Sequence, residues 1–210
     1  MKFTPIDLEH WKRKEYFTHY KDEIPCTYSM SIKLDITNIK EKQYRLYPTM
    51  IYIITTAIRE YEEFRIGYNE EGKLGIFDEL IPCYTIFHKD TETFSNLWTN
   101  YNENYDIFLK EYENDFKEYG DRKQMMAKPN VPINNFPISM IPWITFEGFN
   151  LNLQKGYDYL LPIFTMGKYY IENGTYYLPL SVTVHHAVCD GFHISRFLNR
   201  LQTMIAQFDK

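Results

Sequence analysis

The sequence predicts an α/β (α+β) protein, a two-layer sandwich in which helices cover a mixed, largely antiparallel sheet. Three observations point to this class. Several segments alternate apolar and polar residues as strands do, tight-turn signals join pairs of them, and other segments carry apolar residues at helical spacing. The strict strand–helix alternation of a doubly wound fold is missing, and no glycine-rich phosphate loop follows a strand.

The first half of the chain opens with a helix that stops before Pro25, because the residue preceding a proline disfavours helical backbone. Pro48 suits the first turn of a second helix, where its missing N–H costs nothing. The expected elements are helices over about residues 11–20 and 48–64, a strand over residues 26–36, and a hairpin of residues 65–68 and 73–76 around the turn 69–72.

The second half contains a polar region, residues 100–128, whose aromatic residues recur at helical spacing. We expect its helix to end near Gly120. Asn173-Gly174 is a strong hairpin signal between the last two strands. The remaining expected elements are strands over residues 83–88, 139–146, 161–171 and 175–184, and a final amphipathic helix over about residues 191–208.

Length and composition narrow the class of protein. The 210 residues fit a single domain over residues 1–210. The formal net charge of −5 argues against a nucleic-acid partner, which requires a concentrated basic face. No stretch is long and apolar enough for a membrane span, and the N-terminus lacks a secretory leader. Three irregularly spaced cysteines form no disulfide framework, so we expect a cytoplasmic protein.

The most informative segment runs from Val184 to His193, where a strand leads through His185-His186 and a short turn into the last helix. Three explanations fit its residue types. One imidazole can act as a general base near neutral pH. His185, Cys189 and His193 have the spacing of metal ligands on a helix, although Gly191 interrupts such a helix. The residues can also be structural, with Asp190 capping the last helix. Residue chemistry alone leaves the three open and disfavours the metal site.

A resemblance to a known family favours the first explanation. The segment His185-His186-Ala187-Val188-Cys189-Asp190-Gly191 matches the H-H-x-x-x-D-G signature of the CoA-dependent acyltransferases and resembles the chloramphenicol acetyltransferase version of it. Matching segments occur in family order along nearly the whole chain. They include Trp11-Lys12-Arg13, Pro25-Cys26-Thr27-Tyr28, Tyr47-Pro48, Phe87-His88 with Glu92-Thr93-Phe94-Ser95, Ile141-Pro142-Trp143, Phe149-Asn150-Leu151-Asn152 and Pro162-Ile163-Phe164-Thr165-Met166.

The resemblance implies acetyl transfer from acetyl-CoA to the primary hydroxyl of chloramphenicol, without an acyl-enzyme intermediate or a metal. It makes His186 the general base, oriented by its own backbone carbonyl. It makes Ser139 the donor to the oxyanion, and Thr165 the residue that holds a water nearby. By resemblance, Asp190 pairs with Arg13 and locks the turn after His186, and it is not expected to orient the imidazole.

The resemblance also supplies binding residues and an assembly. The residues matching the antibiotic pocket are Tyr20, Ile24, Tyr28, Phe94 and Leu151. Lys168 is assigned from its position just after Thr165, where its ammonium group can meet a phosphate of acetyl-CoA. A homotrimer is implied, in which His186 of one chain faces Tyr20, Tyr28 and Ser139 of its neighbour. His185 and His193 receive no catalytic role. Two alternatives stay open: an O-acetyltransferase of the same fold that uses a different hydroxyl acceptor, and a non-catalytic metal- or ligand-binding protein.

Overall fold

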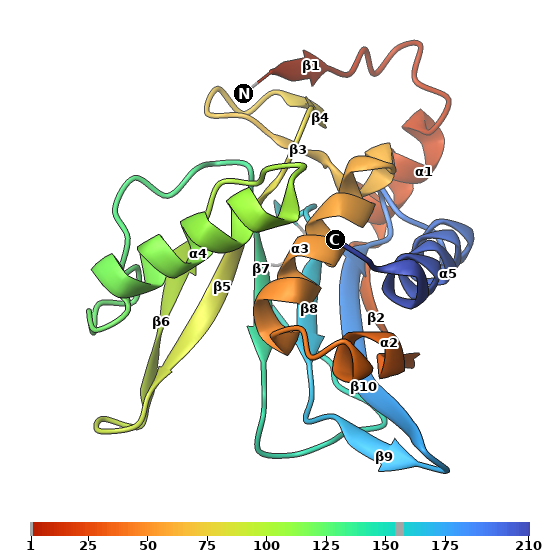
Figure 1. Ribbon diagram of the computed structural model, residues 1–210. Coiled ribbons are helices and arrows are strands. Elements are labelled where there is room, and N and C mark those ends of the chain that lie inside the picture. Colours follow the sequence, from red (N-terminus) through yellow and green to blue (C-terminus); the bar gives the residue numbers. More distant parts are fainter. Residues whose placement is uncertain (1, 154–157) are drawn as a thin grey trace.

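The computed structural model describes residues 2–153 and 158–210 and is built around one large sheet (Figure 1). Its strand order is β2-β10-β8-β7-β5-β6, and β9 pairs with β10 beside this path. The β5–β7 and β7–β8 pairings are parallel, and the other pairings in this sheet are antiparallel. The strands are β2 (Thr27–Asp35), β5 (Ile81–His88), β6 (Thr93–Trp98), β7 (Asn135–Met140), β8 (Ile163–Met166), β9 (Tyr170–Glu172) and β10 (Thr175–His185). The predicted class, a mixed and largely antiparallel sheet with helices, is confirmed.

Helices cover one face of this sheet, and Figure 1 shows α3, α4 and α5 ranged over it. The helices are α1 (Lys14–Thr18), the π-helical η1 (His19–Glu23), α2 (Thr37–Glu41), α3 (Leu46–Arg59), the 3₁₀ turn η2 (Glu62–Phe64), α4 (Tyr105–Tyr119) and α5 (Gly191–Gln207). A small second sheet consists of β1 (Phe3–Pro5), β4 (Leu74–Phe77) and β3 (Ile66–Tyr68). Within the described residues, no helix combines the length and apolarity that a membrane crossing requires.

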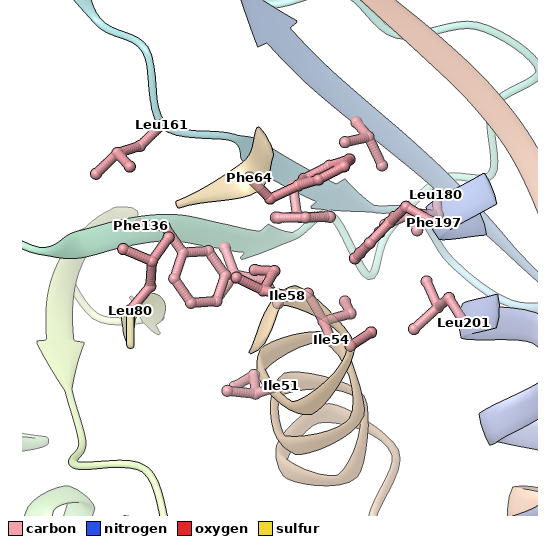
Figure 2. Close-up of a cluster of buried hydrophobic side chains, with 14 of the residues drawn as sticks. Ile51, Ile54, Ile58, Phe64, Leu80, Phe136, Leu161, Leu180, Phe197 and Leu201 are labelled. Carbon is pink, nitrogen blue, oxygen red and sulfur yellow. The ribbon is translucent and has the colours of Figure 1, made fainter. Parts of the chain in front are cut away.

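The core lies between the sheet and the helices, and Figure 2 shows part of it. Alternate residues of β10 point into it, because side chains on a strand alternate between its faces. Leu180 on β10 packs in the same buried cluster as Phe197 and Leu201 of α5 and Ile54 of α3. Each such side chain, when fully buried, contributes about 1.5–3 kcal/mol to the free energy of unfolding. The core therefore fixes the end of β10 relative to the start of α5.

The strongest sequence patterns gave the correct elements. The strand over residues 26–36, the hairpin, the helix ending at Gly120 and the final helix are all present within a few residues of their expected limits. The second helix begins at Leu46 and ends at Arg59 instead of residue 64. Tyr61 has extended backbone, with φ of −130°, and the turn that follows stacks Phe64 on Phe197 with ring centroids 4.3 Å apart. Packing against α5 therefore overrides helix propensity here.

Two strand predictions were wrong. The strand expected over residues 139–146 lies at Asn135–Met140, because Pro137 is tolerated within β7 while the chain leaves the sheet before Pro142. The strand expected over residues 161–171 is broken into β8 and β9 at Gly167, whose N–H instead bonds the carbonyl of Pro179. Elements β1, α2 and β6 were not predicted.

Candidate active site

The backbone of His186 is held from two sides at the end of β10. Its N–H donates to the carbonyl of Cys26, 2.9 Å away, just before β2. Its carbonyl accepts a hydrogen bond of 2.8 Å from Nη2 of Arg13, and Arg13 Nε donates to the carbonyl of Ala187 at 2.7 Å. The turn that carries His186 is therefore fixed by groups from the beginning of the chain.

The same guanidinium holds the carboxylate of Asp190. Arg13 Nη1 and Nη2 donate to Oδ2 and Oδ1 at 2.7 and 2.5 Å. These hydrogen bonds hold the pKa of the Asp190 carboxyl below its ordinary value, and burial opposes them. Arg13 is the N-cap of α1, and Asp190 is the N-cap of α5. The structure thus brings together the pair that the resemblance implies.

The imidazole of His186 packs between two tyrosines of its own chain. The ring of Tyr20 stacks on it with centroids 3.9 Å apart and planes 16° apart, and Tyr28 lies at 5.4 Å, tilted by 60°. Nδ1 is buried and makes no hydrogen bond, while 28% of the side chain is exposed. The accessible nitrogen is therefore Nε2.

Two expectations about this ring need correction. Asp190 was placed away from the imidazole, yet its Oδ1 lies 3.2 Å from Nδ1, because the turn folds back onto the ring. The contact is electrostatic, since Nδ1 makes no hydrogen bond and Arg13 occupies both carboxylate oxygens. The carbonyl of His186 was expected to orient its own ring, but it accepts from Arg13 and receives no bond from Nδ1.

Buried neutral groups close the inner side of the turn. The hydroxyl of Tyr28 donates to the carbonyl of Cys189 at 3.2 Å, and burial raises the pKa of this phenol so that it keeps its proton. Burial also raises the pKa of the Cys189 thiol to about 12. Cys189 is therefore a neutral packing residue, because a thiol acts as nucleophile or metal ligand only as the thiolate.

Ser139 lies at a second location, near the end of β7. Its hydroxyl donates to Oγ1 of Thr165 on β8 at 3.2 Å. Ser139 and Phe94 line a cavity of about 640 Å³. Several aromatic residues of this cavity were not predicted as site residues, although three of them lie in segments that matched the family. They are Tyr47, Phe87, Tyr112, Phe116 and Trp143.

His186 and Ser139 of one chain lie too far apart to act on one reacting atom. Ser139 pairs with Thr165, which pairs with Ser181 on β10, five residues before His186. Five extended residues span roughly 16 Å along the sheet, and two strand spacings add about 10 Å across it. Figure 1 shows the end of β10 beside α1, at the far end of the strand from β9.

The predicted site residues therefore fall into two groups. Arg13, Tyr20, Tyr28 and Asp190 surround His186, whereas Thr165 and Phe94 accompany Ser139. The expectation that Tyr20 and Tyr28 face His186 from a neighbouring chain is wrong, since they contact it within the chain. The remaining predicted residues, Ile24, Leu151 and Lys168, belong to neither group. Ile24 and Leu151 are 59% and 39% exposed, and Lys168 is exposed.

The structure gives no support to the metal alternative. His185 ends β10, whereas His193 lies in the first turn of α5, so the two do not share a helix. Among residues 2–153 and 158–210, no group of three or more histidine, cysteine or acidic side chains could hold a metal ion.

Solved structures of known proteins share the fold of this chain. A solved chloramphenicol acetyltransferase superposes with a TM-score of 0.82 at 21% identity, covering 97% of this chain and all of the other. The dihydrolipoamide acetyltransferase of Azotobacter vinelandii superposes with a TM-score of 0.63 at 16% identity, covering 87% and 82%. The fold is that of the CoA-dependent acyltransferases.

The family follows from sequence. The family model described as chloramphenicol acetyltransferase matches residues 1–202. A chloramphenicol acetyltransferase of Vibrio anguillarum is 62% identical over 205 residues, which cover 98% of this chain and 95% of the relative. The chain belongs to the chloramphenicol acetyltransferase family, and it is an enzyme of the acyltransferase class.

Proposed function

We propose that this enzyme transfers the acetyl group of acetyl-CoA to the primary (C3) hydroxyl of chloramphenicol and thereby inactivates the antibiotic. The family match over residues 1–202 supports the reaction and the two substrates. The observation that carries the mechanism is the histidine whose backbone is fixed by Arg13 and whose Nε2 is accessible. We assign the reaction to residues 1–210 acting as one domain, without a metal, in the cytoplasm.

His186 is the general base. Nε2 removes the proton from the acceptor hydroxyl, and the oxygen attacks the thioester carbonyl directly, so no acyl group is carried by the protein. The tetrahedral intermediate then collapses with cleavage of the C–S bond, and the departing CoA sulfur takes up the proton from Nε2, which restores the neutral base. A positioned base supplies about 10²–10⁴ in rate. As Nε2 takes the proton, the ring becomes an imidazolium, which the carboxylate 3.2 Å from Nδ1 stabilises. Stacking on Tyr20 keeps the ring in one orientation.

Ser139 stabilises the oxyanion of the tetrahedral intermediate. Its hydroxyl is half-buried beside an apolar cavity, where a hydrogen bond to a charged oxygen is stronger than in water. In the resting protein it donates to Thr165, which is 4% exposed and so keeps a fixed position. On binding, the Ser139 hydroxyl turns to the oxyanion and Thr165 holds a water beside it.

The separation of His186 from Ser139 supports a site shared between chains of a homotrimer. Large apolar side chains are exposed around Ser139's cavity: Phe87 by 48%, Phe94 by 49% and Trp143 by 60%. Exposed apolar groups gathered in this way are typical of interfaces. His186 of one subunit then faces Ser139 of the next, while Tyr20 and Tyr28 stay with His186.

The antibiotic occupies the space between these two surfaces. Tyr20 and Tyr28 form its wall beside His186, and Phe94 forms the opposite wall. Ile24 and Leu151 are exposed apolar residues that the bound antibiotic and the neighbouring subunit cover. Lys168, exposed after β8, meets a phosphate of acetyl-CoA and contributes little, since solvent screens it.

A thiol-release assay tests the proposal. Purified protein with acetyl-CoA and chloramphenicol should release free CoA, and His186→Ala should abolish release while both substrates still bind. His10→Ala is the control, because His10 is 85% exposed. No CoA release by the wild-type protein with chloramphenicol, but release with another alcohol, would establish the alternative acceptor.

A further inference from the structure

We infer that His193 is a positioning residue for acetyl transfer: its neutral imidazole holds the backbone of Asp190, and Asp190 in turn holds Arg13 and the turn that carries His186. The inference rests on the proposed function. It gives a role to a histidine two residues beyond the signature, which touches neither the proposed substrate sites nor the reacting atoms.

The hydrogen bonds of His193 require one tautomer. Its Nδ1 accepts the backbone N–H of Asp190 at 3.0 Å, so Nδ1 carries no proton. Its Nε2 lies 3.5 Å from Oε1 of Glu63 in η2, which suits an Nε2–H directed at a carboxylate. The side chain is 20% exposed. His193 thus closes a capping box at the start of α5 and ties Asp190 to a second element of the fold.

Protonation would reverse these contacts. A proton on Nδ1 would face the N–H of Asp190, donor against donor. The same atom lies 3.6 Å from Asp190 Oδ2, the oxygen that Arg13 Nη1 holds at 2.7 Å. An imidazolium would therefore lose the backbone bond and compete with Arg13 for the carboxylate. The turn at His186 would lose part of its support.

The charged groups around His193 come from three elements. Glu63 of η2 and Asp190 favour the imidazolium, whereas Arg13, at the start of α1, and Arg196 of α5 disfavour it. Arg196 also bonds Oε1 of Glu63 at 3.0 Å, so this carboxylate is already partly neutralised. Burial outweighs the two carboxylates and lowers the pKa of His193 below its ordinary value, which keeps the ring neutral near pH 7.

Two substitutions of His193 distinguish a role in positioning His186 from a role in stabilising the fold alone. His193→Gln keeps an acceptor for the Asp190 N–H, because glutamine is an ordinary capping-box residue, but it cannot titrate. His193→Leu keeps the bulk and removes the acceptor. His10→Gln, at an 85% exposed histidine, is the matched control. Steady-state kinetics with acetyl-CoA and chloramphenicol are measured from about pH 5 to 8.5, per folded protein by circular dichroism.

We expect His193→Leu to lower kcat about 10- to 100-fold at neutral pH with little change in either KM, because a misplaced base affects the chemical step. His193→Gln should retain kcat within about threefold of wild type. On the acid side, log kcat/KM of the wild-type enzyme should fall more steeply than that of His193→Gln, since two histidines must be neutral instead of one. A His193→Leu protein with wild-type kcat, or a His193→Gln profile identical to wild type, would overturn the inference.

Histidine NMR gives a readout that does not depend on turnover. With ¹³C-labelled histidine, the His193 ring should show the Nε2–H tautomer, and the His186 resonance should shift when His193 titrates. That second inflection should vanish in His193→Gln. Coupled titrations in a protein that releases no CoA would refute the proposed function and leave the positioning intact; independent titrations in an active enzyme would refute the positioning alone.

Discussion

Arg13 donates two hydrogen bonds, of 2.7 and 2.5 Å, to the carboxylate of Asp190. The same guanidinium also donates to the backbone carbonyls of His186 and Ala187. One side chain near the beginning of the chain therefore satisfies a carboxylate and two carbonyls of a turn more than 170 residues later. The side chain of Arg13 is 14% exposed and that of Asp190 is 34% exposed. The pair is partly screened, and its geometry matters more than its charge.

Replacing Arg13 by lysine tests this conclusion. Lysine keeps the charge but lacks the planar fork that reaches three acceptors at once. We expect Arg13→Lys to lower kcat about tenfold or more, because His186 loses its carbonyl partner. Unfolding should become easier by about 1–3 kcal/mol, below the 3–5 kcal/mol of a fully buried pair since Asp190 is accessible. Urea denaturation and the thiol-release assay measure both effects, with the exposed Lys12→Met as control.

The proposed site between subunits predicts complementation between two inactive chains. His186→Ala and Ser139→Ala homotrimers should each be nearly inactive, with Ser139→Ala losing about 10²–10³ in kcat. After equal amounts are unfolded together and reassembled, about a quarter of the interfaces carry both native residues, because each site takes one residue from each neighbour. Activity near a quarter of wild type is expected. Verified mixed oligomers without recovered activity would refute the proposal that His186 and Ser139 of neighbouring subunits act in one site.

Stability should fall in two steps as the pH is lowered. The pKa of His193 in the folded protein lies below its ordinary value of 6.5, and that of Asp190 lies below 3.8. In both cases the unfolded chain binds protons first, so stability is fully present above the unfolded pKa and is lost as the pH falls toward the folded one. His193→Gln should remove the step that begins near pH 6.5, and Asp190→Asn the step below 3.8. Urea midpoints recorded across the pH range would reveal either step. If the loss of stability that begins near pH 6.5 is unchanged in His193→Gln, a group other than His193 causes it.

Much of this arrangement was predictable from the sequence, and the remainder depends on contacts between distant segments. The last strand and helix carry strong local patterns, so the position of His186 between them followed directly. The approach of Asp190 to Nδ1 did not, because it depends on how a short turn folds back. Stacking of Tyr20 on His186 joins residues 166 apart in the chain, and no local pattern encodes it. Pro137 concealed β7, since proline is rare inside strands.

The loop that carries Leu151 is attached to the sheet by two serines. Ser181, which is 2% exposed, donates to the carbonyl of Phe149 at 2.6 Å, and the N–H of Phe149 donates to Ser31 Oγ at 3.2 Å. Ser181→Ala leaves that carbonyl without its partner, at a cost of about 1–3 kcal/mol. We expect a several-fold higher KM for chloramphenicol with little change in kcat. Ser29→Ala is the matched control, since the Ser29 hydroxyl joins the same two strands by its 2.6 Å hydrogen bond with the Thr183 hydroxyl.

Gly167 tests whether the same loop must lie close to the sheet. A Cβ on Gly167 would come within 2.9 Å of one ring atom of Phe146, a distance that real contacts essentially never reach, and within 3.0 Å of a second. The ring would have to move, so we expect Gly167→Ala to lower the free energy of unfolding by about 1–3 kcal/mol, as overpacking does. Gly148→Ala, in the same loop with open space around the added carbon, should change stability little. If thermal unfolding finds the two variants equally stable, Phe146 does not pack on Gly167 in solution and the loop is held by its serine contacts alone.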